Sequence, residues 1–597
     1  MEDPFKPLSL SIKELFGNTD SLYKIPQYQR PYKWEDEQVD KLWDDIYEAY
    51  ENGEDNYFLG SVITAKPRDD EKSAYVDVVD GQQRLTTLMI MFCVLRDTYP
   101  NINKNEADEN PYAVDIDTLQ SSIAVNGKAK RLKLYTHMQH QSDFENIILN
   151  GDTSKLKKPY KFQIRTDEEP KFKFINSAVL LRQKFEALGE DVANDFVNFI
   201  FNQVKIIRID CKSREFAIKL FQVLNDRGMD LTAADLIKSY LLEKLYKKYK
   251  EDSETSKMKE QQFVADWRDM EQSIKSCDIN LNDLFIIYEY YILAQNPKKS
   301  LYDELQDAFK DLDPNSLIGD IKKFASIYFD EIWLAEDKTI YSFRYIRWNM
   351  YWKSILLAGL HSQYAEFDAL KHQLRRFYYL YWIAGKTLSQ IKQTSFNLIK
   401  WVKENKPINE IIIELNNKIQ SDGIVDLATR NLTSEYIASE VWCKPLLIMM
   451  EYNSSDNSTI PFIELNQDLH LEHVLPVKYD KFPEWSHITK EIASMWLNSA
   501  GNITLLGGAK NIEASNNPFQ VKMEVYKGKG KYDTKNDKIT AFKITQKIVS
   551  DYESNSYAQS WTLEAMQDRW EWFYTEAAEI LEIDLDEVIK QHQPKLV

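Results

Sequence analysis

Cysteine is scarce in this chain, and long apolar runs are absent from it. Among 597 residues there are four cysteines, Cys93, Cys211, Cys277 and Cys443, and no two of them form a Cys-x-x-Cys pair. The sequence therefore contains no readable zinc ribbon, and scattered thiols of this kind suit a reducing compartment. No window reaches 18 consecutive apolar residues, and the first residues lack the apolar run of a signal peptide. We therefore expect a cytoplasmic protein without a membrane span.

A general excess of positive charge is also missing. The formal net charge is −18, which argues against a protein that coats nucleic acid but leaves room for a local basic surface. The sequence has no Gly-x-x-x-x-Gly-Lys-Ser/Thr loop, so any nucleotide chemistry must use another phosphate cradle. Hydrophobic residues make up 43% of the chain and aromatic residues 13%, which indicates folded domains rather than global disorder.

The pattern along the chain predicts a multidomain α+β protein of three blocks. Residues 1–245 mix strand and helix signals, residues 246–424 are almost entirely helical, and residues 425–597 combine short strands, turns and a closing helix. In the closing helix, apolar residues recur at steps of three and four from Leu563 to Ile580, as expected of a face packed on a core. The helical block is expected to be a spacer, docking or relay region.

A polar turn joins a strand to a helix in the first block. Residues 57–64 and 75–79 are predicted strands, and the apolar run from Leu85 to Leu95 is a predicted helix, while 101–117 is expected to be a loop or insertion. Asp80 is expected at the N-cap of that helix, and Gly81 allows a sharp turn or close backbone approach. The first N–H groups of a helix attract anions, and Arg84 adds a forked donor suited to phosphate. A capped helix with a surface salt bridge is the alternative interpretation.

A histidine beside a carboxylate marks the last block. Glu472 and His473 end a short apolar segment, Asn502 opens the next one, and Asn511 lies on the segment that follows. Phosphodiester hydrolysis needs a base to activate water and a cation to hold the scissile phosphate, and carboxylate and amide oxygens suit a hard cation. The alternative is a buried histidine beside a surface glutamate, with the asparagines serving turns.

Lysines follow this segment closely. Between Phe519 and Lys547 there are eight lysines and three acidic residues, a local excess of five positive charges. Lys527, Lys529 and Lys531 alternate with glycines, so the stretch is either a phosphate-tracking loop or merely a solvated one. If neither this loop nor its neighbours contact DNA, the basic segment from Lys155 to Lys173 is the next candidate.

The first block resembles the N-terminal domain of GmrSD-type modification-dependent (type IV) restriction endonucleases, which is related to the ParB/sulfiredoxin-like fold. The matching segments are Ile25–Trp34, Asp80–Arg84, Phe221–Gly228 and Leu231–Asp235. The resemblance implies a ParB-like α/β domain that binds and hydrolyses a nucleoside triphosphate and controls cutting. The nucleotide-binding residues it implies are Gln29, Arg30, Asp80, Gly81, Gln82, Gln83 and Arg84.

The last block is similar to the ββα-metal (HNH) motif and to the C-terminal domain of the same restriction enzymes, here set within helices. The similarity rests on Glu-His-x-x-Pro at 472–476, Asn-Ile-Thr-Leu-Leu at 502–506 and Ser-Asn-Asn-Pro-Phe at 515–519. It implies that His473 is the general base, that Glu472 and Asn511 are ligands of Mg²⁺ or Mn²⁺, that Asn502 braces the loop and that Lys522 contacts phosphate. The role of His470 stays open.

Together the two resemblances imply a nucleotide-regulated, metal-dependent DNA endonuclease of anti-phage defence. Its expected partners are double-stranded DNA, notably modified phage DNA, and a nucleoside triphosphate, and a homodimer is compatible with this interpretation. Two alternatives remain: a nucleotide-dependent DNA-binding regulator whose nuclease domain is inactive, and an RNase toxin built on the HNH fold.

Overall fold

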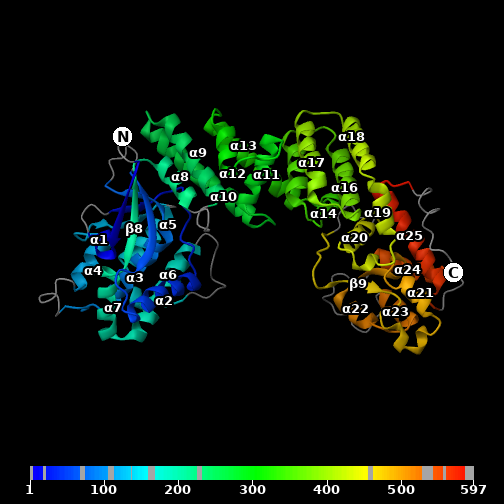
Figure 1. The fold of residues 1–597 in the computed structure, drawn as a ribbon, viewed down its shortest axis with the longest axis horizontal. Helices are drawn as coiled ribbons and strands as arrows, with labels where there is room; N and C mark the ends of the chain where they lie inside the picture. The colour runs from blue at the N-terminus through cyan, green and yellow to red at the C-terminus, as the bar shows by residue number, and fades with distance from the viewer. Residues whose placement is uncertain are drawn as a thin grey trace. The chain divides into compact units, whose positions relative to one another are not determined.

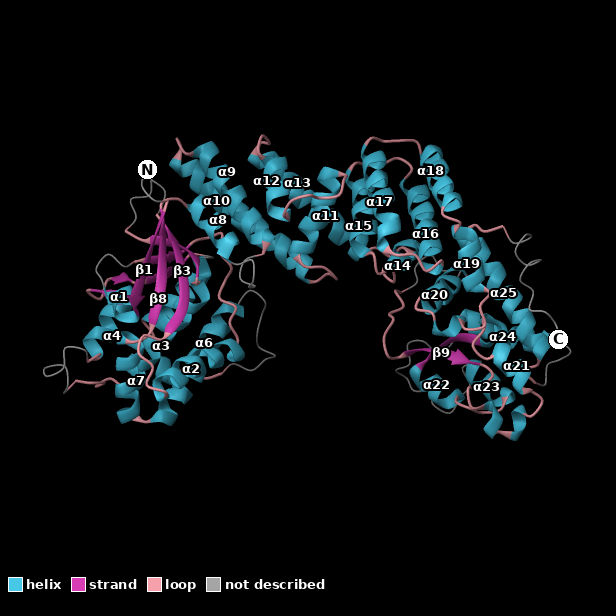
Figure 2. Cartoon of the chain, viewed as in Figure 1, coloured by secondary structure: helices cyan, strands magenta, loops and turns pink. Residues whose placement is uncertain are grey.

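In the computed structural model the described residues are 4–17, 22–66, 74–104, 113–135, 138–158, 169–224, 232–454, 461–527, 542–554 and 560–584. The chain divides into two compact units, Met1–Ala265 and Asp266–Val597, whose helices and strands are drawn in Figure 1 and Figure 2. No helix within the described ranges combines the length and apolar character needed to cross a membrane.

A six-stranded mixed sheet organises the N-terminal unit, in the order β1-β8-β3-β4-β2-β7. Strand β8 runs antiparallel to β1 and parallel to β3, β4 runs antiparallel to β3, and β2 pairs in parallel with both β4 and β7. The strands are β1 (Phe5–Ser11), β2 (Tyr23–Ile25), β3 (Phe58–Ala65), β4 (Val76–Asp80), β7 (Leu132–Leu134) and β8 (Lys205–Cys211), and β5 (Ala124–Val125) and β6 (Ala129–Lys130) form a separate pair.

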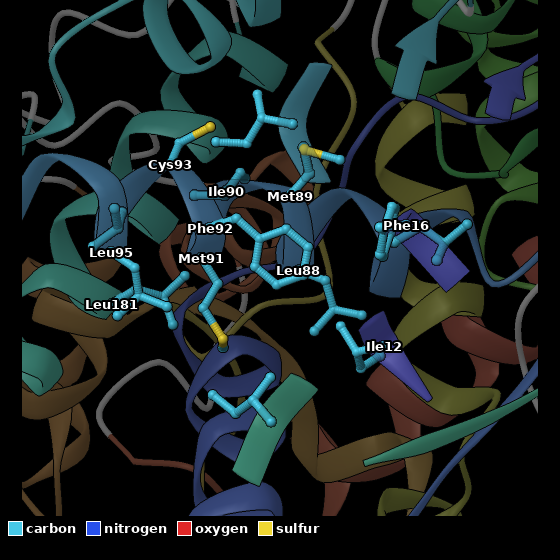
Figure 3. Close-up of a cluster of buried hydrophobic side chains, with 14 of the residues drawn as sticks. Ile12, Phe16, Leu88, Met89, Ile90, Met91, Phe92, Cys93, Leu95 and Leu181 are labelled. Atoms are coloured by element: carbon cyan, nitrogen blue, oxygen red, sulfur yellow. The ribbon is translucent and has the colours of Figure 1, made fainter. Parts of the chain in front are cut away.

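Helix α3 (Gln82–Thr98) forms the centre of this unit's core. Its residues from Leu85 to Leu95 are apolar or small on every side and all are buried, as expected of a helix surrounded by other elements. Figure 3 shows Leu88 and Phe92 near Ile12 and Phe16 of α1, and Leu181 of α6 near Leu95. The other helices of this unit are α1 (Ile12–Gly17), α2 (Asp36–Glu51), α4 (Ile116–Ile123), α5 (Met138–Asp143), α6 (Glu169–Leu188), α7 (Glu190–Asn202), α8 (Arg214–Leu224), α9 (Ala233–Tyr249) and α10 (Ser253–Lys275), which continues past Ala265.

The described part of the C-terminal unit is mainly helical, with a short antiparallel pair of strands, β9 (Leu469–His473) and β10 (Ile503–Gly507). Helices of the expected middle block lie in the same compact unit as this pair. The helices are α11 (Leu281–Leu293), α12 (Leu301–Phe309), α13 (Pro314–Ile327), α14 (Lys338–Phe343), α15 (Asn349–His361), α16 (Phe367–Ile383), α17 (Leu388–Lys403), α18 (Ile408–Ser421), α19 (Ile424–Leu432), α20 (Cys443–Asn453), α21 (Lys490–Trp496), α22 (Gly508–Ala514), α23 (Phe519–Tyr526), α24 (Lys543–Ser554) and α25 (Leu563–Leu581).

The α+β class and the main elements expected from the sequence are confirmed. The predicted strands correspond to β3 and β4, the predicted apolar helix to α3, and the closing helix α25 buries Met566 and Phe573 completely. The expected N-cap at Asp80 is wrong: Asp80 ends β4, and Gly81 caps α3 in a left-handed conformation. The expected loop 101–117 already contains the start of α4 at Ile116, and residues 105–112 lie outside the described ranges.

Candidate functional site

Strands β9 and β10 pair antiparallel, and helix α22 follows β10 directly. The register places His473 opposite Ile503 and Glu472 opposite Thr504. Because successive side chains of a strand point to opposite faces, Glu472 and His473 face opposite sides of the pair. Their contacts agree, since Glu472 meets α23 whereas His473 meets the segment that precedes β10. The β9, β10 and α22 order is a ββα arrangement.

The His473 imidazole is half-buried at the end of β9. Its Nε2 lies 3.1 Å from the Asn498 side-chain oxygen Oδ1, and an amide oxygen only accepts hydrogen bonds. Nε2 therefore carries the hydrogen when the ring is neutral, and Nδ1 is left with a lone pair. Burial lowers the pKa of His473, against the opposing effect of Asn498, so the neutral ring is favoured over a wider pH range.

Asn502 clamps the loop that follows His473. It is fully buried, its Oδ1 accepts from the Leu475 backbone N–H at 2.7 Å, and its Nδ2 donates to the Leu475 carbonyl at 3.0 Å. Nδ2 also donates to the Leu497 carbonyl at 2.9 Å, and the indole N–H of Trp561 donates to Oδ1 at 3.1 Å. These four bonds satisfy the amide. They hold the segment at Leu475, which follows His473, to the segment at Leu497, which precedes Asn498.

Behind β9, Glu472 belongs to a buried polar cluster with Lys522 and Tyr526 of α23. The Lys522 ammonium donates to Glu472 Oε1 at 2.7 Å and to the His473 carbonyl at 2.7 Å, and the Tyr526 hydroxyl donates to the same Oε1 at 2.9 Å. Lys522 is 0% exposed and Glu472 5% exposed. Burial raises the pKa of Glu472 and lowers that of Lys522, while each charge counteracts the shift of the other.

In the N-terminal unit, Gly81 connects β4 to α3 by a turn that only glycine accommodates. Its φ of +84° lies in the left-handed region, and a Cβ there would stand 2.8 Å from the Val62 side chain and 3.2 Å from the Ser61 carbonyl oxygen. Gly60 has a φ of +122°, and a Cβ on it would stand 3.0 Å from the Arg84 guanidinium. The two glycines therefore let the start of α3 lie close against β3.

The polar residues expected at this turn are tied to the backbone around it. Gln29 Nε2 donates to the Val79 carbonyl at 2.8 Å, and Arg84 Nη1 donates to the Ser61 carbonyl at 2.9 Å. Gln83 accepts from the Lys33 backbone N–H at 2.8 Å and donates to the Pro31 carbonyl at 3.1 Å. These bonds connect the segment after β2 to the first turn of α3.

All seven residues that the sequence assigns to nucleotide binding line one cavity. Its walls are Gln29, Arg30, Trp34, Val79, Asp80, Gly81, Gln82, Gln83 and Arg84. The buried side-chain oxygens of Gln29 and Gln82 have no hydrogen-bond partner among the described residues, and such orphaned acceptors suit a site that awaits a polar ligand. The cavity holds about 30 Å³, room for a small polar group rather than for a whole nucleotide.

Comparison with known families decides the identity. Residues 12–242 match the family model described as GmrSD restriction endonuclease, N-terminal domain, and residues 420–575 match that of the GmrSD restriction endonucleases, C-terminal domain. The chain belongs to the GmrSD restriction endonuclease family. The first match contains the Gly81 turn and its cavity, and the second contains His473, Asn502 and the Glu472 cluster. A search of curated proteins finds no match.

The lysines that the sequence assigns to DNA contact in this GmrSD chain have different surroundings. Lys522 is enclosed with Glu472, so in this structure its ammonium does not reach the surface. Lys527 is paired with Glu553 at 2.7 Å and with Glu524 at 3.3 Å. Lys529 and Lys531 lie outside the described residues, as does 159–168 of the alternative basic segment. DNA contact by these lysines stays a prediction.

The expected metal ligands of the GmrSD C-terminal domain are separate donors rather than a preformed cluster. Within the described part of the chain, no group of three or more His, Cys, Asp or Glu side chains could hold a metal ion. Carboxylate and amide oxygens are ligands that a hard cation accepts. Among the described residues, Glu472 Oε2 takes part in no hydrogen bond, whereas Oε1 accepts from Lys522 and Tyr526. Asn511, half-buried on α22, would add an amide oxygen. His470 is half-buried on β9.

The sequence interpretation assigned no site role to three residues that the structure places at these sites. Asn498 orients His473, Tyr526 holds Glu472, and Asp235 of α9 lies 3.5 Å from the Arg30 guanidinium. Tyr526 follows Lys522 by four residues on α23, so helical spacing would have placed the two on one face. Asn498 lies outside any regular element and leaves no comparable signal in the sequence.

Proposed function

We propose that this chain is a nucleotide-regulated, metal-dependent DNA endonuclease that cuts modified foreign DNA, with an HNH-type centre at His473. The observation that carries the proposal is the ββα arrangement of β9, β10 and α22, in which a half-buried histidine is oriented by Asn498. Membership of the GmrSD restriction endonuclease family supports DNA as the substrate.

In this proposal, His473 removes the proton from the attacking water. Nε2 is occupied by Asn498, so the free lone pair at Nδ1 is the basic atom, and the lowered pKa keeps the ring neutral and ready to accept a proton. Asn502 contributes by fixing the loop after β9, which sets the direction of the imidazole.

A divalent ion, Mg²⁺ or Mn²⁺, would supply charge stabilisation at the scissile phosphate when bound. Glu472 and Asn511 are the residues proposed to hold it; because the Glu472 carboxylate faces Lys522 and Tyr526 rather than the His473 side of β9, it would have to turn to reach an ion beside His473. Lys522 and Tyr526 bind one carboxylate oxygen of Glu472, and hydrogen bonds of this kind commonly orient a ligating carboxylate.

In the N-terminal unit, the cavity around Gly81 supports binding of a nucleoside triphosphate through one of its phosphate groups. Backbone N–H groups at the start of α3 and the Arg84 guanidinium provide donors for an anion. The orphaned oxygens of Gln29 and Gln82 would accept hydrogen bonds from the ligand or its ordered water. ParB-like architecture remains the expectation for this domain.

A substrate panel tests the proposal. Linear duplex DNA, nicked DNA, single-stranded DNA and RNA are incubated with the full chain, with modified and unmodified phage DNA compared in the presence and absence of each nucleoside triphosphate. We expect cutting of modified duplex DNA that stops with EDTA and returns with Mg²⁺ or Mn²⁺. Cleavage of RNA alone would favour an RNase, and nucleotide-dependent DNA binding without any cleavage would favour a regulator.

A further inference from the structure

Trp561 is a buried tryptophan that contacts Asn502 although 59 positions separate the two residues in the sequence. It lies just before α25 and is 4% exposed, and its indole N–H donates to Asn502 Oδ1 at 3.1 Å. Its ring also packs against Phe519, the first residue of α23, with the ring centroids 5.3 Å apart. Trp561 therefore contacts both the brace of the loop after β9 and the helix that packs behind that strand.

Asn502 is the link between Trp561 and His473. The Asn502 backbone carbonyl accepts from the N–H of Val474, the residue after His473, at 2.9 Å. Its side-chain Nδ2 donates at 2.9 Å to the carbonyl of Leu497, the residue before the asparagine that hydrogen-bonds the His473 ring. The place that Asn502 occupies therefore governs where His473 lies relative to its hydrogen-bond partner.

The indole is the donor that ties the Asn502 amide to the rest of the unit. Asn502 Oδ1 also accepts from the Leu475 N–H at 2.7 Å, but Leu475 belongs to the loop after His473 and would move with it. Trp561 is instead anchored beside α25, whose Met566 is fully buried, and an indole N–H can only donate. Because Asn502 is fully buried as well, solvent does not replace a lost donor. The indole therefore holds the amide oxygen, and the loop with it, in one place.

We propose that Trp561 is a positioning residue for DNA cleavage, whose indole N–H holds Asn502 so that His473 stays against Asn498. The inference rests on the proposed nuclease centre at His473 and adds to it a residue from outside the ββα arrangement. Trp561 acts through Asn502 and not on the DNA. Its loss should therefore lower kcat while the KM for DNA stays unchanged, because the imidazole is displaced and the DNA-binding surface is not.

Steady-state cleavage of duplex DNA by the full chain with Mg²⁺ tests the proposal in Trp561→Phe and Trp485→Phe. Trp485 is the matched control, because it lies in the same unit, is 1% exposed, and its indole N–H has no hydrogen-bond partner among the described residues. Both substitutions shrink a buried ring, but Trp561→Phe also removes the donor to Asn502. If Trp561→Phe does not fold, benzothienylalanine at the same position removes only the donor, since sulfur replaces the indole N–H in a ring of similar size.

We expect Trp561→Phe to lower kcat by about 3- to 10-fold at unchanged KM, the effect of losing one hydrogen bond, and Trp485→Phe to keep the kcat of the wild type. In an Asn502→Ala chain, Trp561→Phe should lower kcat no further, because the residue through which it acts is gone. A kcat for Trp561→Phe equal to that of Trp485→Phe, or a full further loss in the Asn502→Ala chain, would overturn the positioning role. If His473→Ala cuts like the wild type, or if the wild type cuts no DNA, the proposed function fails and the positioning role fails with it.

Discussion

Replacing Lys522 by methionine should destabilise the C-terminal unit strongly, although methionine is apolar and of similar length. The ammonium lies 2.7 Å from Glu472 Oε1, with 0% and 5% of the two residues exposed. Removing one partner leaves an uncompensated buried charge, which costs about 3–5 kcal/mol. The compact unit Asp266–Val597 has 332 residues. At about 2.1 cal/mol/K per residue its unfolding entropy is about 0.7 kcal/mol/K, so the melting temperature should fall by roughly 4–7 °C.

Differential scanning calorimetry of the C-terminal transition measures this effect, and two further variants make it specific. Lys547→Met on α24 breaks an exposed pair with Asp551, 2.9 Å apart and 37% and 43% exposed, and should cost under about 1 kcal/mol. The double variant Glu472→Gln with Lys522→Met removes both charges and keeps an acceptor for Tyr526, so it should recover most of the loss. A Lys522→Met melting temperature equal to that of Lys547→Met would refute the buried-pair reasoning.

The remaining predictions concern pH and nucleotide binding. Burial, reinforced by the charge of Glu304, raises the pKa of Glu289 on α11 to about 7. Because the pKa of Glu289 is higher in the folded than in the unfolded chain, the stability that Glu289 contributes is present at low pH and is lost as the pH rises through about 7. The free energy of unfolding of Glu289→Gln should therefore exceed that of the wild type by about 1–3 kcal/mol at pH 8 and be nearly equal to it at pH 5. The same difference between the two proteins at both pH values would contradict this. Arg84→Ala should weaken nucleoside triphosphate binding by about 10- to 100-fold in calorimetry without unfolding the chain, since it removes a charge-assisted donor; unchanged affinity and hydrolysis would place the nucleotide site elsewhere.

The sequence predicts regular elements well where one local signal dominates. The run from Leu85 to Leu95 is apolar except for Thr86 and Thr87, which predicts a buried segment, and its length favours the helix found as α3. The sequence predicts Asp80 as the N-cap of that helix because Asp is the better capping residue by type. The structure has Gly81 there instead, because glycine can adopt a φ of +84°. Steric fit against Val62, which lies far away in sequence, decided the outcome.

At the sites, the sequence indicates residue types but not their partners. The seven residues assigned to nucleotide binding do line one cavity, because they belong to two segments joined by Gln29 and Gln83. The family resemblance implies a phosphate contact for Lys522. Its burial with Glu472 depends on a contact between residues 50 positions apart, which periodicity and composition do not reveal.

The most direct measurement of the central claim is DNA cleavage by His473→Ala. Removing a general base costs about 10²–10⁴-fold, so the variant should lose cutting while its nucleoside triphosphate hydrolysis and melting temperature remain those of the wild type. His487→Ala is the control, because His487 is an exposed histidine of the same unit that hydrogen-bonds the Trp561 carbonyl, and the variant should cut within a few-fold of the wild type. Near-normal cleavage by a folded His473→Ala chain would contradict the assignment of the nuclease centre to β9, β10 and α22.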